Sequence, residues 1–185
     1  MRPGKLGKKM EFEATPISGA YLVSMNKIED ERGFFARLFC QSEFKNQGLA
    51  DQVIQANLSH NTDSGTLRGM HYQTSPALET KLVRCIRGAI LDVIVDMRPQ
   101  SASYRKHYAV ELNENSDTAL FVPAMCAHGF QTLEPNTDVF YMVSGEYHPD
   151  YERGLRHDDP ALGLNWPCPI DHISDKDQQW PLLTD

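Results

Sequence analysis

The sequence predicts an all-β protein, either a sandwich or a barrel, from three observations. Short runs rich in β-branched and aromatic residues recur at a spacing of about ten residues, as in Lys81–Ile86 and Ile90–Met97. Glycine, proline and asparagine, the residues that turns prefer, separate these runs. Helical periodicity is scarce and is confined to two short stretches, Ser42–Leu49 and Lys176–Gln179.

The expected strands follow one another along the chain, and a turn signal ends each of them. The first run, Tyr21–Met25, alternates weakly, and the two central runs end at Gly88 and Pro99. The later expected strands are Tyr108–Leu112, Ala119–Val122, Phe130–Leu133 and Val139–Val143. The tail from Pro149 onward is rich in proline and aspartate, so we expect it to be irregular.

Length and charge limit the classes of protein that fit. The chain has 185 residues, which indicates one domain able to bury a sizeable core. A net charge of −7 argues against a nucleic-acid partner, because phosphate-backbone binders usually carry a basic surface. No apolar run approaches the roughly 20 residues of a membrane span, so no membrane partner is expected. Four scattered cysteines without a CxxC pair favour reduced thiols and a cytoplasmic location.

The first ten residues, MRPGKLGKKM, differ from the rest of the chain. They contain four basic residues, no acidic residue and no apolar segment of the kind that a secretory signal requires. We therefore expect residues 1–10 to be a disordered leader or an extension, and residues 11–185 to form a single domain.

Asp92 and Asp96 are four residues apart in an expected strand, and residues at that spacing lie on the same face. They could be paired catalytic carboxylates. The favoured interpretation is that they lie at a sheet rim or form ion pairs, because Arg84, Arg87 and Arg98 are near in sequence.

The segment from Gly65 to Gln73, GTLRGMHYQ, is the most unusual stretch of the chain. Two glycines flank Arg68, and His71 follows within three residues. Arg68 offers a planar group suited to phosphate, and His71 is a candidate base because an ordinary histidine has a pKa of about 6.5. Lys81 follows at the start of the next expected strand, and Ala127–Phe130 (AHGF) supplies His128.

Several segments, in this order, resemble one known family. They are DERGFF, GTLRGMHYQ, KLVRCIRGAILDVIVDMR, FVPAMCAHGF, YHPDYERGLRHDDPALGLNWP and ISDKD. Together they resemble the dTDP-4-dehydrorhamnose 3,5-epimerase family. The resemblance implies a cupin-type double-stranded β-helix, that is, a jelly-roll barrel with short flanking helices. It also implies a homodimer formed through strand contributions between subunits, and no metal or organic cofactor.

The implied reaction is epimerisation of a nucleotide-diphosphate-linked 4-keto-6-deoxy sugar at the carbons that flank the ketone. Removing a proton there gives an enolate, so the site needs a base, a cation at the oxygen and an acid on the opposite face. By resemblance, His71 is the base, Asp177 orients it, Lys81 faces the enolate oxygen and Tyr141 is the acid. The tail that carries Asp177 is then expected to fold back over the mouth of the barrel.

The resemblance assigns eight further residues to substrate binding: Arg32, Gln55, Asn57, Arg68, His128, Tyr147, Glu152 and Lys176. The two arginines would hold the diphosphate, and Gln55 and Asn57 would hydrogen-bond nearby. His128 would lie close to the sugar or the phosphate. Tyr147 would stack on the base, with Glu152 and Lys176 at the nucleotide end. The remaining histidines are expected to be surface or structural residues: His60, His107, His148, His157 and His172.

The sequence departs from the family pattern at four places: Arg37, Glu79-Thr80, Met125-Cys126 and Met142. None of these is among the four residues assigned to catalysis. This combination leaves open a CDP- or GDP-linked keto sugar as substrate. It also leaves open an enzyme that inverts only C3 or only C5.

Two other classes of function remain as alternatives. A metal-dependent cupin would need two or three histidines and a carboxylate around one ion, often through an HxH pair, and the sequence has no HxH. A non-catalytic sugar-nucleotide-binding module is expected to lack the base or the acid, and both His71 and Tyr141 are present.

Overall fold

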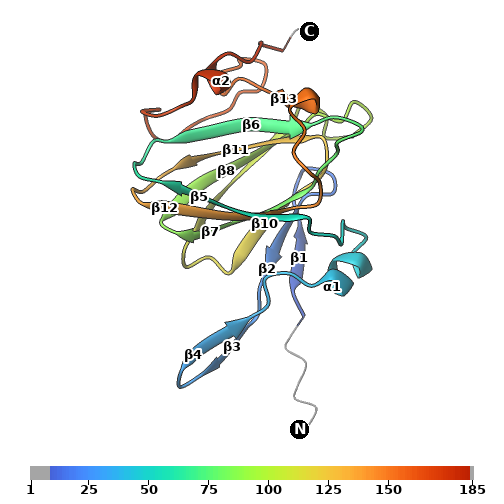
Figure 1. Ribbon diagram of the computed structural model, residues 1–185, viewed down its shortest axis with the longest axis vertical. Helices are drawn as coiled ribbons and strands as arrows, with labels where there is room; N and C mark the ends of the chain where they lie inside the picture. The colour runs from blue at the N-terminus through green and yellow to red at the C-terminus, as the bar shows by residue number, and fades with distance from the viewer. Residues whose placement is uncertain (1–8, 184–185) are drawn as a thin grey trace.

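Two antiparallel β-sheets pack face to face in the computed structural model of the chain, which describes residues 9–183 (Figure 1). The six-stranded sheet has the order β1 (Glu11–Ala14), β2 (Tyr21–Ser24), β10 (Thr118–Val122), β7 (Lys81–Arg87), β12 (Thr137–Val143) and β5 (Gln55–Asn61). The five-stranded sheet has the order β13 (Glu152–Gly154), β6 (Leu67–Gln73), β11 (Cys126–Thr132), β8 (Ala89–Asp96) and β9 (His107–Asn113). The expected all-β jelly-roll architecture of the cupin type is confirmed.

Short elements flank the two sheets. β3 (Lys27–Asp30) and β4 (Gly33–Ala36) form a separate hairpin that projects from one end of the barrel in Figure 1. α1 (Gln41–Asn46) lies beside β1 and β2, and α2 (Asp175–Gln178) lies over β6. A single 3-10 turn, Pro149–Tyr151, precedes β13. Within residues 9–183, no helix is both long and apolar enough to cross a membrane.

The core lies between the facing sheets. Side chains such as Val83 and Leu120 from one sheet pack against Ile90, Ile94 and Phe130 from the other, and all of them are buried. Almost every residue of β8 is buried, because one face meets this core and the C-terminal tail covers the other. This two-sided burial explains why β8 is a continuous apolar run in the sequence.

The C-terminal tail packs on the outer face of the five-stranded sheet. Leu155 and Leu162 are buried there against Met70, Val93 and Val95. Apart from the 3-10 turn, β13 and α2, the tail has the irregular backbone that its composition predicts. Despite this irregular backbone the tail stays packed along the sheet, and its helix α2 lies over β6.

The central strands and both short helices lie close to their expected positions. Six strands, β1, β3, β4, β5, β6 and β13, were not among those expected, and the start of β11 was wrong. The strand expected over Phe130–Leu133 begins at Cys126, because its pairing with β8 starts at Asp96 although its first residues have little β propensity. Of the expected leader, residues 1–8 lie outside the described residues. Met10 is buried, and its backbone N–H donates to the carboxylate of Glu43.

Candidate active site

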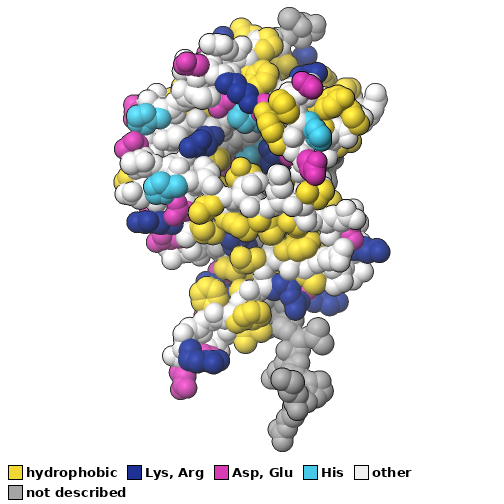
Figure 2. All heavy atoms as spheres, in the orientation of Figure 1, with side chains coloured by type: hydrophobic (Ala, Val, Ile, Leu, Met, Phe, Trp, Pro, Cys, Tyr) yellow, Lys and Arg dark blue, Asp and Glu magenta, His cyan; other side chains and the backbone are white. Residues whose placement is uncertain are grey.

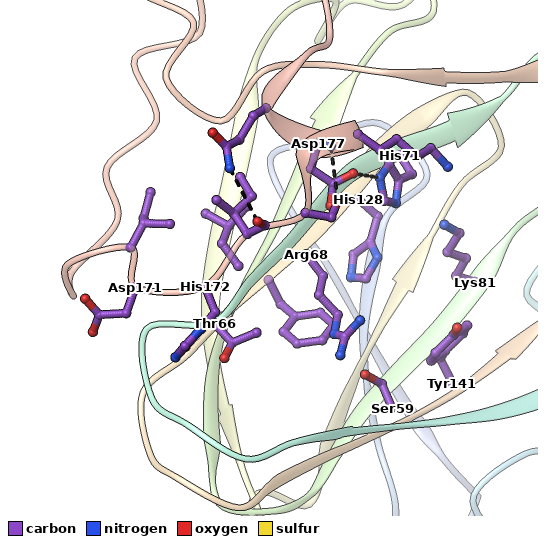
Figure 3. A pocket seen from close by; sticks show the side chains of 17 residues that line it. Ser59, Thr66, Arg68, His71, Lys81, His128, Tyr141, Asp171, His172 and Asp177 are labelled. Atoms are coloured by element: carbon purple, nitrogen blue, oxygen red, sulfur yellow. Dashed lines mark hydrogen bonds and ion pairs between the residues drawn. The ribbon is translucent and has the colours of Figure 1, made fainter.

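A pocket of about 850 Å³ opens between the two sheets, and the tail segment 170–178 forms one of its walls (Figure 3). A second pocket of about 330 Å³ adjoins it. His71, Lys81 and Tyr141 line both pockets, so they lie where the two meet. Figure 2 shows this face hollowed, with histidine side chains visible in the hollow. Among the described residues, no group of three or more His, Cys, Asp or Glu side chains is arranged to hold a metal ion.

His71 and Asp177 form a hydrogen-bonded pair at the wall of the pocket. His71 lies in β6, and its Nε2 is 2.5 Å from Oδ1 of Asp177 in α2 (Figure 3). The second carboxylate oxygen of Asp177 accepts the backbone N–H of Gly69 at 3.2 Å. The carboxylate is therefore held on both oxygens, and it fixes the plane of the imidazole ring.

The local sequence explains how Asp177 reaches β6. Ser174 caps α2, since its Oγ accepts the backbone N–H of Asp177 at 3.1 Å. Just before the cap, the carbonyl oxygen of His172 accepts the N–H of Leu67 at the start of β6. The tail thus folds back over the barrel mouth, as we expected from the sequence.

Asp177 stays ionised in this setting. Burial alone would raise the pKa of its carboxyl group. Hydrogen bonds from His71, Gly69 and Ser174, together with the charge of His71, outweigh burial and hold the pKa below its usual value. A carboxylate that is charged at neutral pH can stabilise a protonated imidazole beside it.

Lys81 and Tyr141 come from the opposite sheet. Lys81 begins β7 and Tyr141 lies in the adjacent β12, where it pairs with Val83. Burial, and next the charge of Glu79, raise the pKa of Tyr141, while Arg68 opposes them. The Tyr141 hydroxyl is therefore protonated at neutral pH and can donate a proton.

Arg68 of β6 and His128 of β11 also line the larger pocket. In the pairing of these two strands, His128 lies opposite His71 and Phe130 lies opposite Arg68. The Nε of Arg68 donates to the side-chain oxygen of Asn61 at 2.7 Å. The Nε2 of His128 is 2.6 Å from Oδ1 of the fully buried Asp92. These contacts fix two cationic or polar groups that face the larger pocket.

Asp92 and Asp96 do not act as a pair. Asp92 contacts His128, whereas Asp96 holds Arg98 through two hydrogen bonds of 2.7 Å. The ion-pair interpretation is thus right for Asp96, and the partner of Asp92 is a histidine rather than an arginine. Neither carboxylate lines the two pockets.

Tyr147, Glu152 and Lys176 form a cluster at the outer end of the site. The Tyr147 hydroxyl donates to Glu152 at 2.9 Å, and the ammonium of Lys176 donates to the same carboxylate oxygen at 2.6 Å. Gln55 and Asn57, from β5, line the smaller pocket together with Tyr147 and Glu152. Strand β12 ends at Val143, so the extended backbone that would place Tyr141 and Tyr147 on one face does not continue to Tyr147.

Arg32 is the one expected site residue that lies apart from both pockets. It follows β3 at the turn of the projecting hairpin, its side chain is 83% exposed, and its partner is Asp30 of the same turn. Arg37, at the other end of the hairpin, pairs with Glu43 of α1. Within this chain, neither arginine reaches the residues at the barrel mouth.

Several residues of the pocket walls were not among the expected site residues, and Glu79 and His172 are two of them. Glu79 lines the smaller pocket and pairs with Lys81, a position that its spacing of two residues from Lys81 could have indicated. His172 was expected at the surface or in a structural role; it lines the larger pocket and contacts Asp63 at 3.5 Å.

Comparisons with known proteins point to one enzyme family. The family model for dTDP-4-dehydrorhamnose 3,5-epimerase matches residues 14–185. The dTDP-4-dehydrorhamnose 3,5-epimerase of Sinorhizobium fredii is 39% identical over 176 residues, covering 95% of this chain and 90% of the relative.

Solved structures agree with this grouping. The crystal structure of dTDP-4-dehydrorhamnose 3,5-epimerase from Bacillus anthracis, with TDP and PPi bound, has a TM-score of 0.90 and 35% identity, covering 95% of this chain and all of that one (100%). The dTDP-6-deoxy-D-glucose-3,5-epimerase of Legionella pneumophila, in complex with dTDP-4-keto-L-rhamnose, has a TM-score of 0.87 and 32% identity, covering 94% of this chain and 93% of that one.

Proposed function

The chain belongs to the dTDP-4-dehydrorhamnose 3,5-epimerase family, and on that premise we propose how its pocket performs the reaction. The protein is an isomerase that epimerises a nucleotide-linked 4-keto-6-deoxy sugar, of the dTDP-4-dehydro-6-deoxyglucose to dTDP-4-dehydrorhamnose type. One observation supports the mechanism most directly. His71, which is held by Asp177 of the tail, lies on one sheet, and Tyr141 and Lys81 face it from the other sheet across a shared pocket.

His71 is the proposed base. The C4 ketone acidifies the protons on C3 and C5, because the carbanion left behind is delocalised onto the carbonyl oxygen. The ring nitrogen of His71 that is not bonded to Asp177 takes the proton. The charge of Asp177 stabilises the imidazolium that forms, and its two hydrogen bonds keep the ring in place.

Lys81 and Tyr141 complete the inversion. The ammonium of Lys81 stabilises the negative charge that develops on the ketone oxygen. Tyr141 then gives its hydroxyl proton to the other face of the carbon, so the O–H bond breaks as the new C–H bond forms. Water then restores the hydroxyl proton of Tyr141, and His71 releases to water the proton that it took from the sugar. The overall change is redox-neutral, so this mechanism calls for no redox cofactor, and Lys81 supplies the positive charge at the enolate oxygen.

The remaining residues bind the nucleotide diphosphate. Arg68 and His128 offer hydrogen-bond donors to the diphosphate and the sugar. At the outer end, Tyr147 offers a ring for stacking on the base, and Glu152 and Lys176 offer polar contacts beside it. Gln55 and Asn57 add amide groups along β5. A CDP- or GDP-linked sugar, inversion at a single carbon, and binding without catalysis are the alternatives to be tested.

A homodimer would bring Arg32 into the site. The β3–β4 hairpin exposes apolar side chains, with Phe34 57% and Phe35 68% exposed, and Figure 2 shows hydrophobic side chains gathered on it. A groove at its base is lined by these two rings and by Ile86, which is also exposed. Exposed apolar surface of this kind marks a contact surface. We propose that the hairpin docks on a second copy and carries Arg32 to the pocket of that copy.

A cytoplasmic location fits the four free cysteines.

The function is tested by proton NMR of the metal-free protein in deuterated water with dTDP-4-keto-6-deoxyglucose. We expect deuterium to appear at both C3 and C5. In the His71→Ala variant we expect exchange to fall by at least about 100-fold, while dTDP still binds. Exchange at one carbon only would identify a single-site epimerase. Absence of exchange in the unmodified protein with tight dTDP binding would support a binding module instead.

A further inference from the structure

The carboxylate of Glu79 lies in the pocket and has no role in the proposed mechanism. Oε1 of Glu79 lies 3.3 Å from Nζ of Lys81, and the two side chains are only 12% and 14% exposed. Both residues line the smaller pocket together with Tyr141. A carboxylate in this position is unusual beside a group that must stabilise an enolate, because it neutralises part of the charge of the lysine.

The backbone on both sides of Glu79 is held in place. The N–H of Thr80 donates to Oγ of Ser144 at 2.9 Å, and the N–H of Ser144 donates back to the carbonyl oxygen of Thr80 at 3.1 Å. A Cβ atom at Gly145 would lie 3.1 Å from the Cβ of Glu79, so the two segments pack tightly. The position of Glu79 is therefore fixed to the end of β12, the strand that carries Tyr141.

The charge of Glu79 reaches Tyr141 as well as Lys81. After burial, Glu79 is the next cause that raises the pKa of the Tyr141 hydroxyl, and Arg68 is the group that opposes it. Charged or titratable groups from several elements line the pockets together with Tyr141. They are Arg68, His71 and Tyr72 from β6, His128 from β11, Glu79 just before β7, Lys81 at its start, Tyr147 and Glu152 at the outer end, and Asp171, His172, Lys176 and Asp177 from the tail. Among these, Glu79 is an acid that contacts Lys81 directly.

We propose that Glu79 is a positioning residue for the proton-return side of the reaction. Its carboxylate holds the ammonium of Lys81 at the pocket wall beside Tyr141 and adds a negative charge next to both groups. This inference rests on the proposed function of Lys81 and Tyr141. A residue that only completed the packing of the loop would not change the balance between proton removal and proton return.

The test compares Glu79→Gln with a matched control, Glu146→Gln. Glu146 lies on the neighbouring loop, its side chain is exposed, and it lines neither of the two pockets. For each protein, the rate of deuterium incorporation and the rate of net inversion are measured by NMR with dTDP-4-keto-6-deoxyglucose as a function of pH.

In Glu79→Gln we expect the alkaline limb of inversion to move to lower pH, since removing a nearby negative charge lowers the pKa of a phenol. On that limb net inversion should fall more than exchange, because less of the Tyr141 hydroxyl is protonated. At neutral pH, where the hydroxyl is protonated in both proteins, the ratio should stay the same. Glu146→Gln should match the unmodified protein in both measurements.

An alkaline limb of inversion that does not move in Glu79→Gln would overturn the role of Glu79 alone, provided the unmodified protein is active. An unmodified protein that neither exchanges nor inverts overturns the proposed function and this inference with it. Should Glu79→Gln not fold, Glu79→Ala decides, since it also removes the charge. The alkaline limb of inversion should then move to lower pH, and an unmoved limb would overturn the proposal.

Discussion

Asp96 shows how a single buried charge is stabilised in this barrel. It ends β8 with no exposed surface and accepts hydrogen bonds from Arg98, Ser101 and Ser103, at distances from 2.5 to 2.7 Å. Burial alone would raise the pKa of the carboxyl group, but these bonds outweigh it and hold the pKa well below the usual value of 3.8. The charged form is therefore strongly favoured in the folded protein.

The lowered pKa of Asp96 gives stability a defined pH dependence. Because the unfolded chain binds the proton more readily, this contribution is complete above the unfolded-state pKa of about 4. It is lost as the pH falls from there through the lower pKa of the folded protein. Urea unfolding of Asp96→Asn at pH 7 should give a free energy of unfolding lower by about 2 kcal/mol or more. Below pH 4, the free energy of unfolding of Asp96→Asn should also decline less steeply than that of the unmodified protein.

The control for Asp96→Asn is Asp158→Asn. Asp158 also pairs with an arginine two residues away, Arg156, but 47% of its side chain is exposed. Exposed pairs add little to stability, so this variant should unfold like the parent protein. Equal losses in the two variants would show that the buried network is not the source of the effect.

At the scale of elements, the tail depends on one close contact with β13. The indole ring of Trp180 packs directly on Gly154, where a Cβ atom would lie 2.1 Å from Cε2 of the indole. Gly154 pairs with His71 in β6, and the rings of His71 and Trp180 have centroids 6.4 Å apart. This contact holds the tail against β13 at Trp180, three residues after Asp177.

We predict that Gly154→Ala displaces Trp180 and loosens the contact between Asp177 and His71. Small misplacements of catalytic groups are costly, so the rate of net inversion should fall by about tenfold to 100-fold. A double-mutant cycle provides the control. In a Trp180→Ala background the added methyl group meets no ring, and Gly154→Ala should then have little further effect. Additive losses in the cycle would argue against a steric coupling.

The sequence predicted the elements that periodicity describes and missed those that depend on distant partners. β8 was evident, because a buried strand is a continuous apolar run. β6 was not, because its residues Leu67–Gln73 mix arginine, glycine and histidine. Its fit against β11 needs glycine on both strands, since a Cβ at Gly69 would lie 2.5 Å from the Cα of Gly129. No local pattern reveals such a contact.

The candidate site divides in the same way. The residue types alone indicated the segment that contains Arg68 and His71, and also Lys81 and His128, whereas the resemblance to a family supplied Tyr141 and Asp177. Asp177 is 106 residues away from His71, so a hydrogen bond between them depends on the path of the whole tail. The proposed role of Arg32 depends on a second copy of the chain, which one sequence does not describe.

At the scale of the whole molecule, the proposed dimer makes a prediction about the hairpin. Phe35→Glu places a charge on the exposed apolar surface, and sedimentation velocity should then detect monomers where the unmodified protein forms dimers. Leu182→Glu makes the same kind of change at an exposed residue of the tail and should leave the dimer intact. A dimer that persists in Phe35→Glu would exclude the hairpin as the contact.

Mixed dimers test whether Arg32 acts on the partner subunit. A chain with Arg32→Ala keeps its own His71, and a chain with His71→Ala keeps its own Arg32. If the arginine acts across the interface, one site in each mixed dimer is complete, and a mixture of the two inactive chains should regain activity. Failure to regain activity after subunit exchange would assign Arg32 to its own chain or to no site.

In the proposed mechanism, His71 removes the proton on one face of the sugar and Tyr141 returns a proton on the other. The most direct measurement follows solvent exchange and net inversion together, by NMR in deuterated water, in Tyr141→Phe and His71→Ala. We expect His71→Ala to lose both processes. Tyr141→Phe should continue to exchange deuterium at the carbons beside the ketone while net inversion falls sharply. Equal loss of exchange and inversion in Tyr141→Phe would contradict a mechanism with its base and acid on opposite faces.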